Sequence, residues 1–223
     1  MPQTPPGDPV PQDAAWYWHL LPQFSGGNRV RLLRGGDELF PAIAAAVAEA
    51  RHEVWLATYI FHHDDAARTL AEALAAAARR GVQVRVVVDG FGSHASLPQL
   101  QRWLQPHGVA LVVFRPLERW WNWLQPGQLR RLHQKLCVVD GERAFVGGIN
   151  VIGDRVDLNH GTLESPRLDF AVEVHGPAAR PVEQTARAVW TRAAVGRDWR
   201  DEMVRSEEHT SELQSRLHLV CRL

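Results

Sequence analysis

The alternation of short apolar segments with helical segments over residues 28–114 most limits how this chain can fold. Four segments have the apolar character of β-strands, and they are residues 30–33, 53–61, 82–88 and 109–114. Helices are expected between them, one beginning near Asp37, an Ala-rich one ending at Arg80, and one from Leu97 to Leu104. This alternation favours a largely parallel sheet with helices packed on it. We therefore predict an α/β fold.

Residues 132–150 contain a histidine and a lysine that can act on one anion. Side chains alternate along a strand, so His133 and Lys135 would share a face while Leu136 and Val138 point to a core. Lys135 is the only lysine in a chain with 25 Lys and Arg residues. A lone lysine among arginines indicates that a compact ammonium, rather than a planar guanidinium, is required there.

A turn at Asp140-Gly141 would fold the chain back beside this strand. The return strand, residues 143–146, would run antiparallel and end near His133. Two glycines and an amide follow it, Gly147, Gly148 and Asn150. Glycine lets backbone approach a ligand closely, and an asparagine amide can donate a hydrogen bond. We interpret the hairpin as a phosphate-binding site beside a nucleophile.

The pattern H-x-K-x4-D-x6-G-G-x-N resembles the signature of the phospholipase D superfamily. Other segments, E-L-F-P-A-I, V-V-V-D-G-F-G-S, F-V-G-G-I-N and L-D-F-A-V-E-V-H-G-P, resemble the first half of cardiolipin synthases of the B type. The resemblance covers residues 28–194. It implies a phospholipase D-like, mixed but mainly parallel sheet flanked by helices, with one of two repeats present. A second H-x-K motif is absent from the sequence.

The resemblance also implies roles for the motif residues. His133, Lys135 and Asp140 would be catalytic, although Asp140 could instead support the hairpin turn. Phosphate would be bound by Asn150, Gly147 and Gly148. Asp169 would orient His133 by accepting its Nδ1–H, or it is an ordinary surface residue. No metal or other cofactor is implied, because ammonium groups neutralise the phosphate.

The implied activity is phosphatidyl transfer that makes cardiolipin through a phosphohistidine. The donor would be phosphatidylglycerol and the acceptor a second phosphatidylglycerol or phosphatidylethanolamine. The reaction would take place at the cytoplasmic face of the bacterial inner membrane, where the protein would be peripheral. The active site would need the missing second repeat or a second copy in a homodimer, so little activity is expected from a monomer. Two alternatives are a single-motif phosphodiesterase or nuclease acting as a homodimer, and an inactive fragment. Nucleic acid is the less expected partner, because 25 acidic residues balance the 25 basic ones.

Composition divides the chain into three parts. Residues 1–26 are rich in Pro, Gly and Gln and are expected to form a flexible leader, in which Trp16, Tyr17 and Trp18 dock on the domain or enter a lipid interface. Residues 27–204 would form the domain. Residues 205–223 are expected to be non-native, because R-S-E-E-H-T-S-E-L-Q-S resembles a translated sequencing adapter. The chain would then be a fragment.

Three further features have two interpretations each. His62-His63-Asp64-Asp65 could bind metal, but an aspartate capping the next helix is favoured. Asp89-Gly90-Phe91-Gly92 could form a ligand rim or an ordinary turn. The loop with Trp120, Trp121, Trp123, Arg119, Arg130 and Arg131 could meet a membrane, or fold over the domain or a partner.

The two cysteines, Cys137 and Cys221, are too few for a disulfide framework, and no apolar run approaches the roughly 20 residues that span a bilayer.

Overall fold

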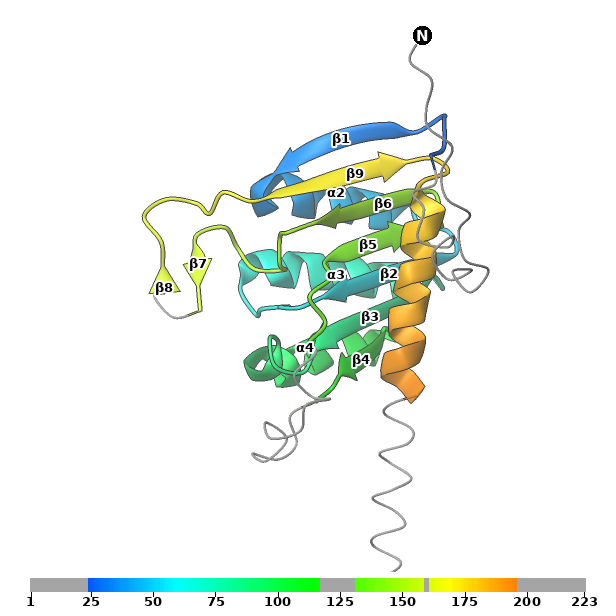
Figure 1. Cartoon of the computed structure of the whole chain (residues 1–223). Helices are drawn as coiled ribbons and strands as arrows, with labels where there is room; N and C mark the ends of the chain where they lie inside the picture. Colours follow the sequence, from blue (N-terminus) through cyan, green and yellow to red (C-terminus); the bar gives the residue numbers. More distant parts are fainter. Residues whose placement is uncertain (1–23, 117–130, 159–160, 196–223) are drawn as a thin grey trace, which may run out of the picture.

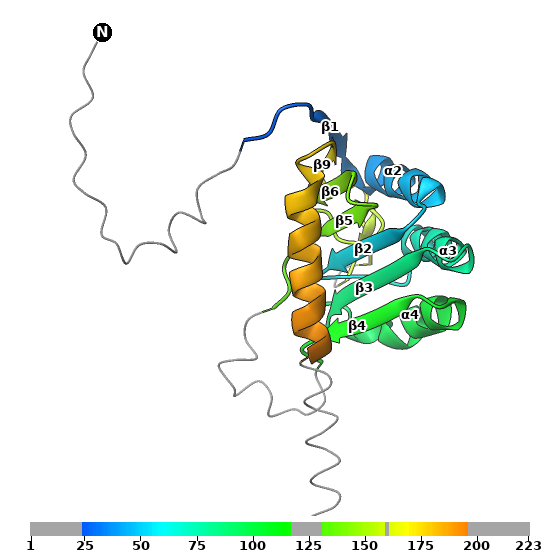
Figure 2. The same cartoon turned by 90° about the vertical axis from the view of Figure 1, so that its right-hand side faces the viewer.

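A seven-stranded mixed sheet forms the centre of the molecule, with helices on both faces (Figures 1 and 2). This computed structural model describes residues 24–116, 131–158 and 161–195. In spatial order the strands are β1 (Arg29–Arg34), β9 (Phe170–His175), β6 (Arg143–Gly147), β5 (Leu136–Val139), β2 (Glu53–Thr58), β3 (Gln83–Asp89) and β4 (Ala110–Phe114). Helices α2 (Gly35–Glu49), α3 (Asp65–Arg79) and α4 (Leu97–Leu104) cover one face. The C-terminal helix, residues 179–195, covers the other.

Short elements complete the chain. Two 3-10 turns, η2 (His94–Ser96) and η3 (Gln105–His107), flank α4. A separate two-stranded sheet pairs β7 (Val156–Asp157) with β8 (Gly161–Thr162). The leader aromatics, the tryptophans between 120 and 123, and the tail from residue 205 lie outside the described residues.

The predicted α/β class is confirmed, but the sheet is not mainly parallel. Only β2 with β3 and β3 with β4 are parallel, and the other four neighbouring pairs are antiparallel. The difference arises where the chain leaves the β-α-β pattern. The predicted hairpin of β5 and β6 is antiparallel, β9 returns beside β6, and β1 lies at the far edge beside β9 rather than next to β2.

The N-termini of α3 and α2 are capped in different ways, one by the adjacent residue and the other by a residue far away in the sequence. Asp64 caps α3, as expected, because its Oδ1 accepts a hydrogen bond from the Ala67 amide at 2.9 Å. The helix expected to begin near Asp37 is α2, which begins at Gly35, so Asp37 lies in its first turn and does not cap it. Asp154 supplies the cap from a distant loop and accepts hydrogen bonds from the amides of Gly36 and Asp37 at 2.8 and 3.2 Å.

Two hydrophobic clusters hold the helices to the sheet. The larger lies beneath α2, α3 and α4 and contains fully buried residues such as Leu70, Leu74 and Val86. The smaller lies beneath the C-terminal helix. That helix faces it with three buried alanines one heptad apart, Ala179, Ala186 and Ala193. Small side chains at this spacing let the helix lie close to the sheet.

Trp55 of β2 contacts the C-terminal helix from the face of the sheet that the helix covers. The guanidinium groups of Arg85 and Arg187 lie 4.5 and 4.8 Å from its ring centroid. Trp190 meets it edge-on with the centroids 6.2 Å apart. Glu53 pairs with both arginines. These contacts supply specific cation–π and ionic attachment beside the alanines.

Replacing Ala186 with leucine tests this packing. The larger side chain has no space against the sheet, so Ala186→Leu should lower the free energy of unfolding by about 1–3 kcal/mol. Urea denaturation measures it through the transition midpoint. Ala188→Leu is the matched control, because Ala188 is exposed on the same helix, and it should change stability by about 0.5 kcal/mol or less. Equal effects of the two substitutions would contradict the packing described.

Candidate active site

His133 and Lys135 lie immediately before β5, at the end of the sheet where β2 finishes. Leu136, the first residue of β5, pairs with Ala57 near the end of β2. His133 is exposed, whereas Lys135 is only 9% exposed and its Nζ donates to the His133 carbonyl oxygen at 3.0 Å. The structure therefore brings the predicted pair together, in the segment that leads into the strand rather than within it.

Tyr59 contacts both members of the pair. Its ring centroid lies 5.3 Å from that of His133 and 5.6 Å from the Lys135 Nζ. The sequence reasoning missed this residue, because the pattern of neither segment says that the loop after β2 meets the chain before β5.

The charge of Lys135 is set by burial and by Asp169. Burial lowers the pKa of Lys135, and the negative charge of Asp169 acts in the opposite direction. Asp169 accepts a hydrogen bond from the Phe170 amide at 2.7 Å. Within the part of the chain that the structure describes, it makes no hydrogen bond to His133. Its charge favours the protonated form of Lys135, and its role in orienting the histidine stays a prediction.

The two glycines of the motif make room for protein rather than exposing free amides. Gly147 donates to the Lys135 carbonyl at 3.2 Å, and Gly148 donates to that of Phe170 at 3.1 Å. A Cβ on Gly147 would meet the backbone of β9, and one on Gly148 would meet the Asp169 carboxylate. These close approaches require glycine. The glycines therefore shape the site, and their amides are already used.

Asn150 ties the hairpin to the loop after β2. Its Oδ1 accepts a hydrogen bond from the Ile60 amide at 3.1 Å. Its Nδ2 has no hydrogen-bond partner among residues 24–116, 131–158 and 161–195. The Nδ2 can still donate a hydrogen bond, and its contact with a phosphate stays a prediction.

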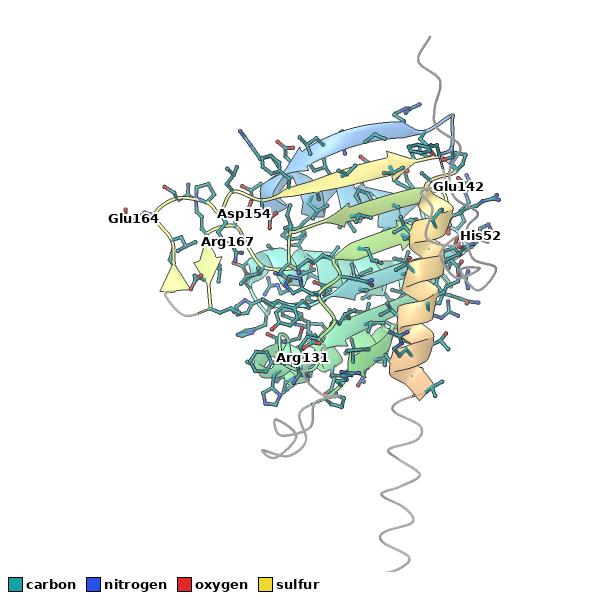
Figure 3. All side chains as sticks on the ribbon, in the orientation of Figure 1. His52, Arg131, Glu142, Asp154, Glu164 and Arg167 are labelled. Carbon is teal, nitrogen blue, oxygen red and sulfur yellow. The ribbon has the colours of Figure 1, made fainter. Side chains whose placement is uncertain are left out.

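Asp140 lies away from His133 and Lys135, as its expected place in the hairpin turn implies, and of the two roles expected for it the contacts favour support of the hairpin. It lies at the far end of β5, in the turn to β6. Its carboxylate accepts hydrogen bonds from three backbone amides, those of Arg51, His52 and Glu53, at 2.8, 2.9 and 2.9 Å. In Figure 3, its neighbours His52 and Glu142 lie at one end of the sheet and Arg131 lies toward the other. The role of Asp140 is to join the hairpin to the start of β2.

Asp89 makes a comparable joint at the active-site end. Its fully buried carboxylate accepts hydrogen bonds from Phe91 and Gly92 within its own turn, at 2.8 and 3.1 Å. Its other oxygen accepts one from the Leu132 amide at 2.8 Å. The predicted turn is therefore an anchor for the residue that precedes His133.

Asp64 of the His-His-Asp-Asp run also binds backbone amides. Its carboxylate caps α3 by accepting a hydrogen bond from the Ala67 amide, and it accepts another from the Gly153 amide.

An apolar groove opens beside the histidine. It has a volume of about 340 Å³ and is lined by His133, Gln134, Lys135, Leu136, Val146, Gly147, Pro181, Val182 and Thr185. The floor comes from β5 and β6 and one wall from the C-terminal helix. The exposed imidazole of His133 thus lines a groove whose other walls are largely apolar. No helix in the described ranges has the length and apolar character needed to cross a bilayer.

A mixed α/β sheet that presents a histidine and a buried lysine in this way defines a phospholipase D-like domain. Comparison with known families agrees, since the model of the family described as "Cardiolipin synthase, PLD-like domain" matches residues 43–163. The chain belongs to this family.

Curated relatives and solved structures show how much of such proteins the chain represents. Cardiolipin synthase B of Escherichia coli K12 is 30% identical over 196 residues, 88% of this chain and 46% of the relative. Cardiolipin synthase A of Pseudomonas putida is 36% identical over 163 residues, 73% of this chain and 33% of the relative. The chain thus spans about half or less of the length of these relatives. Nuc of Salmonella typhimurium, a phospholipase D family member, has a similar fold, with a TM-score of 0.55, 19% identity and coverage of 74% of this chain and 95% of that one.

Removing the Asp140 carboxylate should destabilise the protein without touching the His133 end. Partial burial raises the pKa of Asp140, but the hydrogen bonds from Glu53, Arg51 and His52 outweigh it, so the net pKa is below its ordinary value. We expect Asp140→Ala to lower the free energy of unfolding at pH 7 by about 2 kcal/mol. Glu72→Gln, at an exposed surface ion pair, is the control and should cost about 0.5 kcal/mol or less.

The same contact predicts a pH dependence. A lowered folded pKa means that the carboxylate stabilises the protein fully above the pKa of an unfolded aspartate, about 3.9, and that this is lost as pH falls through the folded pKa. The stability difference between the protein and Asp140→Asn, measured by urea titration, should therefore be constant near neutrality and shrink at low pH. A difference that grew on acidification would contradict the role assigned to Asp140.

Proposed function

We propose that this chain supplies the nucleophilic half of a phosphatidyltransferase active site. The observation that carries the proposal is the exposed imidazole of His133, with the nearly buried ammonium of Lys135 beside it, at the mouth of an apolar groove. A phospholipid has a phosphodiester next to hydrocarbon chains. His133 and Lys135 could bind the phosphodiester, and the apolar groove could hold the hydrocarbon. The relatives named cardiolipin synthase support the same reaction class.

In the proposed first step the neutral Nε2 of His133 attacks the phosphorus. A nitrogen–phosphorus bond forms, the bond to the alcohol oxygen of the donor breaks, and a phosphohistidine remains. Lys135 and the Asn150 amide hold the non-bridging oxygens as charge develops. Asp169 is the proposed acceptor for Nδ1–H. In the second step another alcohol attacks the phosphorus, the nitrogen–phosphorus bond breaks and His133 is restored, while the alcohol proton passes to the histidine of a second copy of the motif.

The proposed donor is phosphatidylglycerol, and the acceptor is a second phosphatidylglycerol or phosphatidylethanolamine. The departing glycerol oxygen needs a proton, which a second copy of the motif would provide, either in a second repeat or in a second chain. We propose that the protein acts peripherally, at the cytoplasmic face of the bacterial inner membrane. The lone chain should then turn over natural lipids slowly.

An activated substrate isolates the first step. A short-chain phosphatidyl-p-nitrophenol releases p-nitrophenolate, which leaves without being protonated, so the missing acid is not needed. We expect a burst approaching one p-nitrophenolate per chain, and mass spectrometry should find the phosphatidyl adduct on His133. His133→Ala should abolish both. Lys135→Met should slow the burst about 100- to 1000-fold.

Controls separate this proposal from its alternatives. Ala188→Leu, on the exposed side of the C-terminal helix, should leave the burst unchanged. A parallel plasmid-nicking assay tests the phosphodiesterase alternative, and cleavage of DNA without a lipid burst would favour that alternative. A burst that survives His133→Ala, or no burst from folded protein, would refute the proposal.

The pH profile of the burst tests the charge state of Lys135. The rate should fall at alkaline pH as Lys135 loses its proton. Because burial lowers the Lys135 pKa, the alkaline fall should occur below the ordinary lysine value of 10.5. Lys135→Arg should be slower but lack the alkaline fall, since a guanidinium stays protonated. The same fall in Lys135→Arg would show that another group causes it.

A further inference from the structure

We infer that Tyr59 is a positioning residue that holds His133 and Lys135 convergent on one point. The inference rests on the proposed function of that pair and adds a residue outside the H-x-K motif. Tyr59 follows β2, and the chain that carries the pair precedes β5, so the contact joins segments 74 positions apart between Tyr59 and His133. Its ring lies 5.3 Å from the His133 ring, centroid to centroid, with the planes at 49°, and 5.6 Å from the Lys135 Nζ.

The surrounding turn fixes the tyrosine. Ser93 Oγ donates to the Tyr59 carbonyl at 3.0 Å and accepts a hydrogen bond from the Phe61 amide at 3.0 Å. Gly92 lies against the same residue, since a Cβ there would be 2.5 Å from the Tyr59 carbonyl oxygen and 3.0 Å from two atoms of its ring. The glycine thus leaves the space that the ring occupies. Tyr59 is held on a rigid turn, as a positioning residue must be.

The same turn also holds the residue before His133. Asp89 accepts hydrogen bonds from Phe91 and Gly92 and, through its other oxygen, from Leu132. The backbone leading into His133 and the ring that contacts its imidazole are therefore tied to one short segment. Movement of His133 relative to Tyr59 would break one of these attachments.

The ring face offers Lys135 a partner that survives desolvation. An ammonium within about 6 Å of an aromatic centroid is attracted to the ring, more strongly where water is excluded. Lys135 is almost buried, and its Nζ donates to a neutral carbonyl. The aromatic face favours the protonated form and restrains the side chain on the side of His133. The face, and not the hydroxyl, makes both contacts, so phenylalanine should replace tyrosine.

The single lysine of the chain makes this testable by chemistry. Apart from the N-terminus, Lys135 has the only amine that an N-hydroxysuccinimide ester can acylate, and peptide mass spectrometry distinguishes the two. Tyr59→Leu should raise the acylation rate of Lys135 about fivefold, because the amine loses both its cover and the contact that favours its charged form. Tyr59→Phe should stay within about twofold of the parent. Trp103→Leu, at a partly buried aromatic of α4, is the control and should also stay unchanged.

His133 provides the second measurement. In ¹⁵N-labelled protein, Tyr59→Leu should shift the His133 ring resonances, while those of His52 and His175 at the other end of the sheet stay unchanged. A merely structural role would move neither the His133 signals nor the Lys135 acylation rate. Unchanged values for both in folded Tyr59→Leu would overturn the inference. Should Tyr59→Leu fail to fold, Tyr59→Met, which preserves more volume, is measured with the same expectations.

The burst assay separates this inference from the proposed function. Tyr59→Leu should slow the p-nitrophenolate burst about tenfold, and Tyr59→Phe should not, because positioning rather than chemistry is lost. If the parent chain gives no burst but Tyr59→Leu still alters His133 and Lys135, the proposed function fails and the positioning role stands. A normal burst from Tyr59→Leu would refute the positioning role alone.

Discussion

The antiparallel pairing of β5 with β2 is the constraint on which the site depends. It sets which residues of the β2 loop face the motif, and a carboxylate secures each end. Asp140 accepts hydrogen bonds from three amides at the start of β2, and Asp89 accepts one from the amide of Leu132, which precedes β5. A slip of one residue would turn every side chain to the opposite face. These two aspartates therefore fix the register that places His133 and Lys135 beside Tyr59.

Glycine performs a complementary task at the same end of the sheet. Gly147 and Gly148 let β9 and Asp169 approach the hairpin, and Gly92 lets Tyr59 approach the β3 turn. Close packing of backbone brings Asp169 near enough to influence Lys135 without contacting its ammonium through a hydrogen bond in the described part of the chain. The close approach of Asp169 to the hairpin thus depends on the absence of side chains at Gly147 and Gly148.

Sequence reasoning predicted the features that depend on neighbouring residues. The Asp140-Gly141 turn, the antiparallel return strand and the cap of α3 by Asp64 follow from local patterns, and all are present. What it missed depends on contacts between distant segments. The cap of α2 comes from Asp154, and β1 pairs with β9 from the other end of the domain. The three amides that Asp140 binds at the start of β2 could not be predicted from the motif, because spacing along the chain does not say which distant segment meets a turn.

The small number of positive charges and hydrogen-bond donors at the site explains why one motif would not suffice for the proposed reaction. Lys135 is the only ammonium side chain of the chain, burial already disfavours its charge, and Asp169 offsets part of its positive field. The glycine amides that might have joined in are bound to carbonyls. One lysine and one amide must then stabilise a phosphodiester that gains negative charge as His133 attacks, with no neighbouring group in the described residues assigned to protonate the leaving oxygen. A second motif facing the first would add another ammonium, another amide and the acid, which is the physical reason to expect the site to be shared.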